Sequence, residues 1–136
     1  MAYASKQDMI DRYGAEELVG ITDRTGANVI DDAVLSSALE NATAEVNSEA
    51  RLNGAITVTD QLTSLTCAIA RYHLTDPCAE RVRKDYEDAI TFLRRVADGR
   101  STLAGQNAET PAAAGNDAPV FVSPQRQFTR DSLGDF

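Results

Sequence analysis

The single histidine, His73, is the first residue to consider for chemistry. Acid–base catalysis or metal binding by histidine requires partner groups at a defined spacing, and the sequence places no second histidine and no carboxylate at metal-ligand spacing around it. The motifs of phosphate-binding loops, dinucleotide-binding folds and serine hydrolases are also absent. We therefore expect no enzymatic activity, no cofactor and no metal ion. His73 is expected to lie on the surface or half-buried on a helix.

The two cysteines, Cys67 and Cys78, lie 11 residues apart. This spacing matches neither a zinc site nor a redox pair. The cysteines are therefore predicted to be reduced thiols, with Cys67 near the core of a helix.

A stretch that begins at Asp23 faintly resembles a calcium-binding loop. An EF-hand needs an oxygen ligand at position five and glycine at position six, where this chain has Ala27 and Asn28. The stretch is better explained as a helix-entry loop, in which Asp31 or Asp32 stabilises the N-terminus of the helix that follows.

Composition and charge narrow the class of protein. The chain has 136 residues, no tryptophan and a hydrophobic fraction of 43% that depends largely on alanine, which favours one domain of closely packed helices. Its net charge is −8, and the first 103 residues carry 17 acidic against 11 basic side chains. Such an acidic body argues against a protein that wraps DNA, although DNA can pass along it. No apolar run is long enough for a signal peptide or a membrane span, so we expect a protein made and used in a cytoplasm, or in an assembly built there.

Hydrophobic periodicity predicts an all-α fold, a small compact bundle of four to five helices. Ser5 and Asp8 form a capping-box pattern for a first helix that ends at Tyr13, before Gly14. A short helical turn follows over 15–21. A long helix is predicted from Asp32 to about residue 53, ended by Gly54; its buried positions are Val34, Leu35, Ala38, Leu39, Ala42 and Val46.

Two further helices complete the bundle, after a loop with some extended backbone over 54–59. Thr59 or Asp60 caps the first of them, with Leu62, Leu65, Ile69 and Tyr72 inward. The last helix is predicted to have Asp76 as N-cap, Pro77 as its first residue and Gly99 at its end. Opposite charges four residues apart on its outer face include Arg94 and Asp98.

Phe92 lies beside the apolar stripe of the last helix rather than on it. Two explanations fit a large ring in this position. It is either the edge of the core or a contact with a neighbouring subunit, so Phe92 is a candidate subunit-interface residue.

The chain divides into a helical body (residues 1–103), a flexible linker (104–118) and a C-terminal arm (119–136). The linker has no large apolar side chain and cannot offset its ordering entropy. The arm carries apolar anchors and two arginines four apart, which form a candidate partner-binding set: Val120, Phe121, Val122, Arg126, Phe128, Arg130, Leu133 and Phe136.

A comparison of burial free energy with the entropy cost of ordering indicates when such an arm becomes ordered. Burial of six apolar side chains yields roughly 9–18 kcal/mol, whereas fixing eighteen residues costs about 1–2 kcal/mol each. The arm is therefore expected to remain disordered on an isolated molecule. It can become ordered when a partner supplies backbone hydrogen bonds and several copies bind together. A disordered, dispensable terminus is the other explanation.

Three segments carry a family resemblance: "YASKQDMIDRYGAEELVGITDR", "VIDDAVLSSALENATAEV" and "AIARYHL…VRKDYEDAITFLRRVADGR". In this order and spacing, over about residues 3–103, they resemble the head–tail adaptor family of Mu-like tailed phages. Two departures from the family pattern are a less acidic loop at "DRTGANVID" and no proline in "RLNGAITVTD".

The resemblance implies a structural virion protein in the neck between head and tail, made in the host cytoplasm. It implies a ring of about twelve copies that binds the portal protein and a downstream tail or stopper protein, and that lines the DNA exit channel without binding DNA specifically. The charge of the body predicts a mainly negative inner wall. Alternatives are a stopper or tail-completion protein of the neck, or an assembly factor absent from finished virions.

Overall fold

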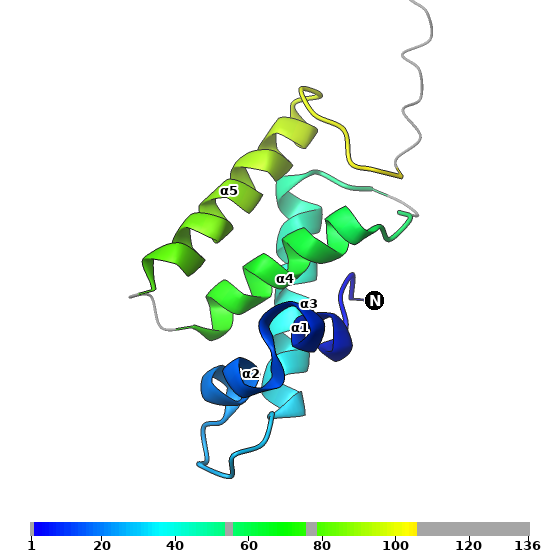
Figure 1. The fold of residues 1–136 in the computed structure, drawn as a ribbon. Helices are drawn as coiled ribbons and strands as arrows, with labels where there is room; N and C mark the ends of the chain where they lie inside the picture. Colours follow the sequence, from blue (N-terminus) through cyan, green and yellow to red (C-terminus); the bar gives the residue numbers. More distant parts are fainter. Residues whose placement is uncertain (1, 54–55, 76–78, 106–136) are drawn as a thin grey trace, which may run out of the picture. The chain divides into compact units, whose positions relative to one another are not determined.

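The computed structural model describes residues 2–53, 56–75 and 79–105 (Figure 1). Within these ranges the chain forms five α-helices and no β-strand. The helices are α1 (Lys6–Tyr13), α2 (Ala15–Thr22), α3 (Asp32–Glu49), α4 (Asp60–Leu74) and α5 (Glu80–Ala97). The predicted all-α fold is confirmed.

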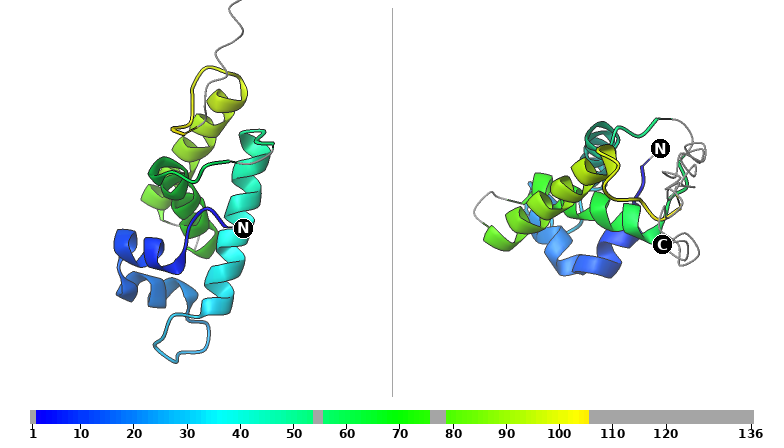
Figure 2. Two further views of the ribbon diagram at one scale, coloured as in Figure 1. Left: turned by 90° about the vertical axis from the view of Figure 1, so that its right-hand side faces the viewer. Right: turned by 90° about the horizontal axis from the view of Figure 1, so that it is seen from above.

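Helices α1 and α2 form a short hairpin against the N-terminal half of α3 (Figure 2). The Ser5 hydroxyl accepts from the backbone N–H of Asp8, and the Asp8 carboxylate accepts from the N–H of Ser5, so the predicted capping box is present. Gly14 separates the two helices at φ 85°, a conformation that favours glycine because it has no Cβ.

Helix α3 contributes one long buried face to the core, and α4 packs between it and α5 (Figures 1 and 2). Five of its six predicted inward positions are buried, and Val34 is half-buried. Thr43 is also buried, and its hydroxyl is satisfied there by donating to the Leu39 carbonyl within the helix. The core cluster joins this face to the inner faces of α4 and α5, through residues that include Leu62, Ile69, Ile90 and Leu93.

The prediction that α3 extends to residue 53 is wrong, because the helix ends at Glu49. Arg51 adopts φ 52°, and the N–H of Leu52 donates to the Asn47 carbonyl (3.0 Å). This is a Schellman end in which an arginine takes the position usually held by glycine. Leu52 packs against the core from the end of this turn, which gives a reason for the chain to reverse before Gly54.

Helix α4 begins where the sequence predicts it. The Thr59 hydroxyl accepts from the N–H of Leu62, and residues 56–59 have no regular secondary structure. Leu62 and Ile69 are fully buried, whereas Leu65 and Tyr72 are half-buried.

The predicted start of α5 is wrong, while its end is confirmed. Ala79 has extended backbone (φ −80°, ψ 95°), so the first helical residue is Glu80 rather than Pro77. An acid followed by proline favours a helix start but does not fix one, and residues 76–78 lie outside the described ranges. At the other end Gly99 adopts φ 71°, and the N–H of Arg100 donates to the Arg95 carbonyl (2.8 Å), a second Schellman end.

Segments outside the helices also join the body. The backbone of Tyr3 donates to the Thr43 hydroxyl and accepts from the Thr63 hydroxyl, so the segment before α1 connects α3 and α4. After α5, Leu103 is buried and the N–H of Ala104 donates to the Gln61 side chain (2.9 Å).

Candidate functional site

The loop between α2 and α3, residues 23–31, is an irregular segment that its own hydrogen bonds hold in shape. One carboxylate, that of Asp23, accepts hydrogen bonds of 2.7–3.2 Å from four successive backbone N–H groups, those of residues 25–28. The bond from Asn28 is the leading cause of a lowered Asp23 pKa, because these donors favour the ionised carboxylate. Gly26 (φ 74°) and Asn28 (φ 57°) complete the tight turn.

This geometry explains the faint calcium-loop resemblance by backbone hydrogen bonding rather than by metal binding. The carboxylate that would be the first metal ligand instead closes the loop on its own backbone, as an extended Asx turn. Within the described residues, no group of three or more histidine, cysteine, aspartate or glutamate side chains could hold a metal ion.

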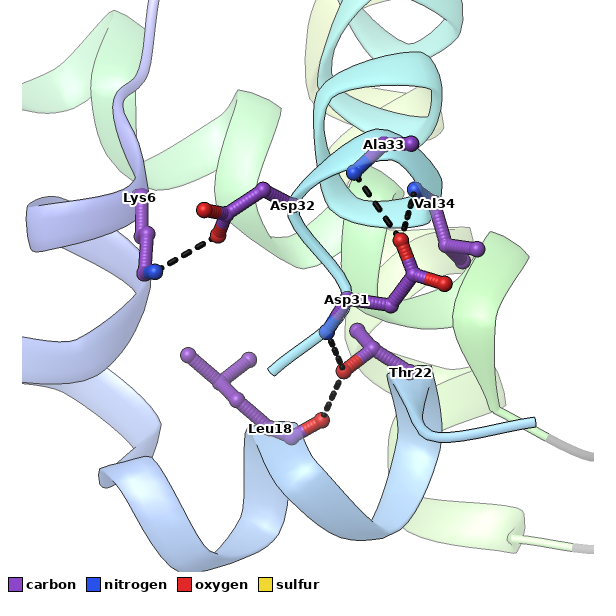
Figure 3. A network of polar contacts seen from close by, with 7 residues as sticks. All are labelled: Lys6, Leu18, Thr22, Asp31, Asp32, Ala33 and Val34. Carbon is purple, nitrogen blue, oxygen red and sulfur yellow. Dashed lines mark hydrogen bonds and ion pairs between the residues drawn. The ribbon is translucent and has the colours of Figure 1, made fainter. Parts of the chain in front are cut away.

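A polar network fixes where the loop leaves α2 and enters α3 (Figure 3). The Thr22 side chain, fully buried, donates to the Leu18 carbonyl (2.7 Å) and accepts from the N–H of Asp31 (3.2 Å). The Asp31 carboxylate caps α3 by accepting from the N–H groups of Ala33 and Val34. The prediction that Asp31 or Asp32 stabilises this helix start is confirmed for Asp31, while Asp32 pairs with Lys6 (2.6 Å).

The loop presents an apolar side chain on this ordered frame. Val29 is 60% exposed, and Val58 (52%) is the other large apolar side chain that is exposed in the described ranges. Arg24, on the same loop, is exposed and forms no ion pair with any residue that the structure describes. The loop therefore offers an apolar group and a cation on a backbone that its own hydrogen bonds hold in shape.

His73 and Cys67, two residue types that can support catalysis, lie in contacts between helices or in the core. His73 is exposed on α4, as predicted, and its Nε2 lies 2.7 Å from Oε2 of Glu45 on α3. The other oxygen of Glu45 accepts from the Tyr86 hydroxyl of α5, so Glu45 joins three helices. Cys67 is fully buried, and burial raises its pKa to about 11; Cys78 lies outside the described residues.

Two predicted surface features have different outcomes. Phe92 is half-buried and packs against the core cluster, which agrees with the core-edge explanation; its role at a subunit interface stays a prediction. The predicted pair of Arg94 with Asp98 is wrong, because the Arg94 guanidinium contacts Glu49 of α3 (2.8 Å). A long side chain at the end of α5 reaches an acid on the neighbouring helix as easily as one on its own helix.

The linker and the C-terminal arm lie outside the described residues from residue 106 onward. The predictions for the arm therefore stay predictions: Val120, Phe121, Val122, Arg126, Phe128, Arg130, Leu133 and Phe136. Near the start of the linker, Gly105 adopts φ 82°, and a Cβ there would lie 2.7 Å from a methyl group of Thr59. The described helices include none that is long and apolar enough to cross a membrane.

Sequence reasoning missed two groups that organise this region. Asp23 was considered only as a metal ligand, although "DRTG" is a pattern typical of an Asx turn. Glu45 carried no signal, since its partners His73 and Tyr86 lie 28 and 41 residues away in the sequence.

Comparison with known proteins adds evidence that the fold alone does not carry. The family model described as "Bacteriophage Mu, Gp36" matches residues 3–122. The chain is 36% identical over 107 residues to the "Mu-like prophage FluMu protein gp36" of Haemophilus influenzae, with 74% of each chain covered. It is 29% identical to "Gene product J" of Escherichia phage Mu, with 94% of this chain and 99% of that protein covered.

Proposed function

The chain belongs to the Bacteriophage Mu Gp36 family, and from this premise we propose that it is a structural protein of the virion, the head-to-tail adaptor. In this proposal about twelve copies form a ring beneath the portal. The ring joins the capsid to the tail and surrounds the channel through which DNA leaves. Family membership over residues 3–122 is the observation that carries the proposal.

The distribution of polar groups supports a structural role. Thr22 and Glu45 make hydrogen bonds that hold one helix or loop to another, and Asp23 closes its own loop by hydrogen bonds to the backbone. The net charge of −6 over the first 103 residues suits a ring that DNA must pass without binding, and we propose a mainly negative inner wall.

The C-terminal arm is proposed to bind the portal. The family match extends beyond the body to residue 122 and so includes Val120, Phe121 and Val122. Arg126 and Arg130 would pair with acidic groups of the portal, and Phe128, Leu133 and Phe136 would add apolar contacts. Because every copy in a ring carries the same arm, binding of one arm raises the effective concentration of the others.

Mass spectrometry of purified phage particles tests the virion assignment first. The adaptor proposal requires this chain in the particle, in a portal-containing complex that forms without tail proteins. Absence from finished particles would identify an assembly factor instead. Presence only in complexes that require tail proteins would indicate a stopper or tail-completion protein.

Truncation after Gly115 tests the arm. We expect the truncated body to keep its helical circular dichroism while portal binding is lost. Two full-length variants distinguish loss of the apolar side chains from loss of chain length. The first combines Phe121→Ser, Phe128→Ser and Phe136→Ser in the arm. The matched control combines Ala112→Ser, Ala113→Ser and Ala114→Ser in the linker. Only the phenylalanine set should abolish binding. Equal binding by both sets would show that the arm is not the anchor.

A further inference from the structure

A shallow groove of about 350 Å³ crosses α4 between the C-terminal end of α1 and the N-terminal half of α5. Its floor includes the half-buried side chains of Leu65 and Ala68 and the buried Ala89, and Tyr13 forms part of one wall. The groove thus leaves part of the apolar surface of α4 and α5 uncovered by the described residues, while the Arg71 guanidinium lies over the ring of Tyr13 (4.4 Å to the ring centroid).

The α5 wall of this groove is negative. Asp85 and Asp88 line it, both are exposed, and neither forms an ion pair with a residue in the described part of the chain. Near the opposite wall the guanidinium of Arg12 donates to the Ser64 hydroxyl (3.0 Å), a neutral acceptor, so the negative charge of the groove is confined to its α5 side. An occupant with an apolar tip and a cation on its flank would suit this surface.

The loop over 23–31 of the same chain has these properties, since Val29 is 60% exposed and Arg24 forms no ion pair within the described ranges. It is also pre-ordered by the Asp23 carboxylate, so docking costs little conformational entropy. The loop and the groove are built from different residues, and one molecule can therefore offer its loop to one neighbour while its groove accepts the loop of another.

We infer that loop 23–31 of one copy inserts into the α1–α4–α5 groove of the next copy, with Val29 on the apolar floor and Arg24 beside Asp85 and Asp88. This inference rests on the proposed ring. Contacts between two different surfaces of identical chains are heterologous, and they close into a ring when the rotation between copies permits. A ring requires every copy to carry both complementary surfaces, which favours a second copy of this chain as the occupant.

The test uses the full-length chain, alone and with its portal, and measures ring assembly by mass photometry and negative-stain microscopy. Arg24→Glu and Asp88→Arg should each raise the concentration needed for assembly about tenfold or more, because each places like charges together. Val29→Asp should have a similar effect, and Val58→Asp, at comparable exposure, is the matched control that should leave assembly unchanged. The double variant Arg24→Glu with Asp88→Arg should recover much of the loss.

The possible outcomes distinguish failure of the proposed contact from failure of the proposed ring. Rings that form normally in the Arg24→Glu and Val29→Asp variants would overturn the contact and leave the adaptor proposal intact. Equal loss in Val58→Asp, or no recovery in the double variant, would also overturn it. A wild-type chain that stays monomeric both alone and with portal would overturn ring and contact together.

Disulfide trapping gives a direct geometric check in a Cys78→Ser background. Chains with Val29→Cys and chains with Ala68→Cys should form a disulfide-linked dimer when mixed under oxidising conditions, and neither should do so alone. Dimers of Val29→Cys chains alone would indicate a symmetric loop-to-loop contact and would contradict the inference.

Discussion

The ring of Tyr86 on α5 stacks on the ring of Tyr72 on α4, with their centroids 4.0 Å apart and their planes at 12°. The Tyr86 hydroxyl also donates to Glu45 of α3. This hydrogen bond, followed by burial and the charge of Glu45, raises the pKa of Tyr86 to about 12. One side chain therefore links three helices, and its hydrogen bond to Glu45 requires the neutral hydroxyl.

We expect Tyr86 to stabilise the fold at neutral pH and to lose this effect at alkaline pH. Because its pKa is raised on folding, its contribution is complete below the ordinary value of about 10 and is lost as pH rises towards 12. At neutral pH, Tyr86→Phe should lower the free energy of unfolding by about 1–2 kcal/mol. Denaturant unfolding of both proteins across this window should show the difference shrinking; a constant difference would contradict the assignment.

A second prediction compares two buried threonines. Thr22→Val leaves the N–H of Asp31 without its acceptor, and we expect a loss of about 1–3 kcal/mol in the free energy of unfolding. Thr66→Val is the control, because the Thr66 hydroxyl only donates to the carbonyl of Leu62 in its own helix and its loss should cost under about 0.5 kcal/mol. Thermal unfolding of the two variants checks this ranking, and equal losses would refute it.

The two Schellman ends give a third prediction with opposite signs. Arg51→Gly should stabilise the protein by about 0.5–1 kcal/mol, since a residue with a Cβ is disfavoured at φ 52°. Gly99→Ala, at φ 71°, should destabilise it by about 1 kcal/mol for the same reason. Urea unfolding of both variants provides the measurement. Destabilisation by Arg51→Gly would mean that the arginine side chain makes a contact worth more than the strain.

The fourth prediction concerns the order of loop 23–31. Asp23→Ala should increase hydrogen exchange at the amides of residues 25–28, while Asp11→Ala, at an exposed position on α1, should leave these amides unchanged. In the wild type the same amides should lose protection as pH falls below about 3.8 and through the lowered pKa of Asp23, because the protonated acid is a weaker acceptor. NMR-detected exchange and a carboxyl titration check both statements.

Much of the helical body was predictable from local patterns. Ser5 with Asp8, Thr59 and Gly99 are cap signals that act within a few residues, and each occurs where predicted. The apolar period of α3 also identified its buried face. Such signals depend on neighbouring residues, so a single sequence contains them in full.

Apart from the start of α5, where a local cap signal was too weak, the errors arose where distant residues decide the local structure. The end of α3 depends on Leu52, which packs into a core formed by other helices. This contact outweighs the preference for glycine in the left-handed position, so the helix ends with Arg51 in that position rather than extending to Gly54. Arg94 likewise binds Glu49, 45 residues away, instead of the nearby Asp98. Residues 23–31 form a helix-entry loop, as predicted, but neither the closure of this loop by Asp23 nor its choice as a candidate site was predicted, because metal-binding and Asx-turn patterns share the same residue types.

The hydrogen bonds of Tyr3 have a consequence for how this chain is synthesised. The partners of its backbone, the hydroxyls of Thr43 and Thr63, lie 40 and 60 residues further along the chain. A ribosome must therefore release α4 before the segment that it translated first can take its final place. Until then, helices that form early leave part of their apolar surface exposed to solvent. Chaperones that bind nascent chains would bind the protein at this stage.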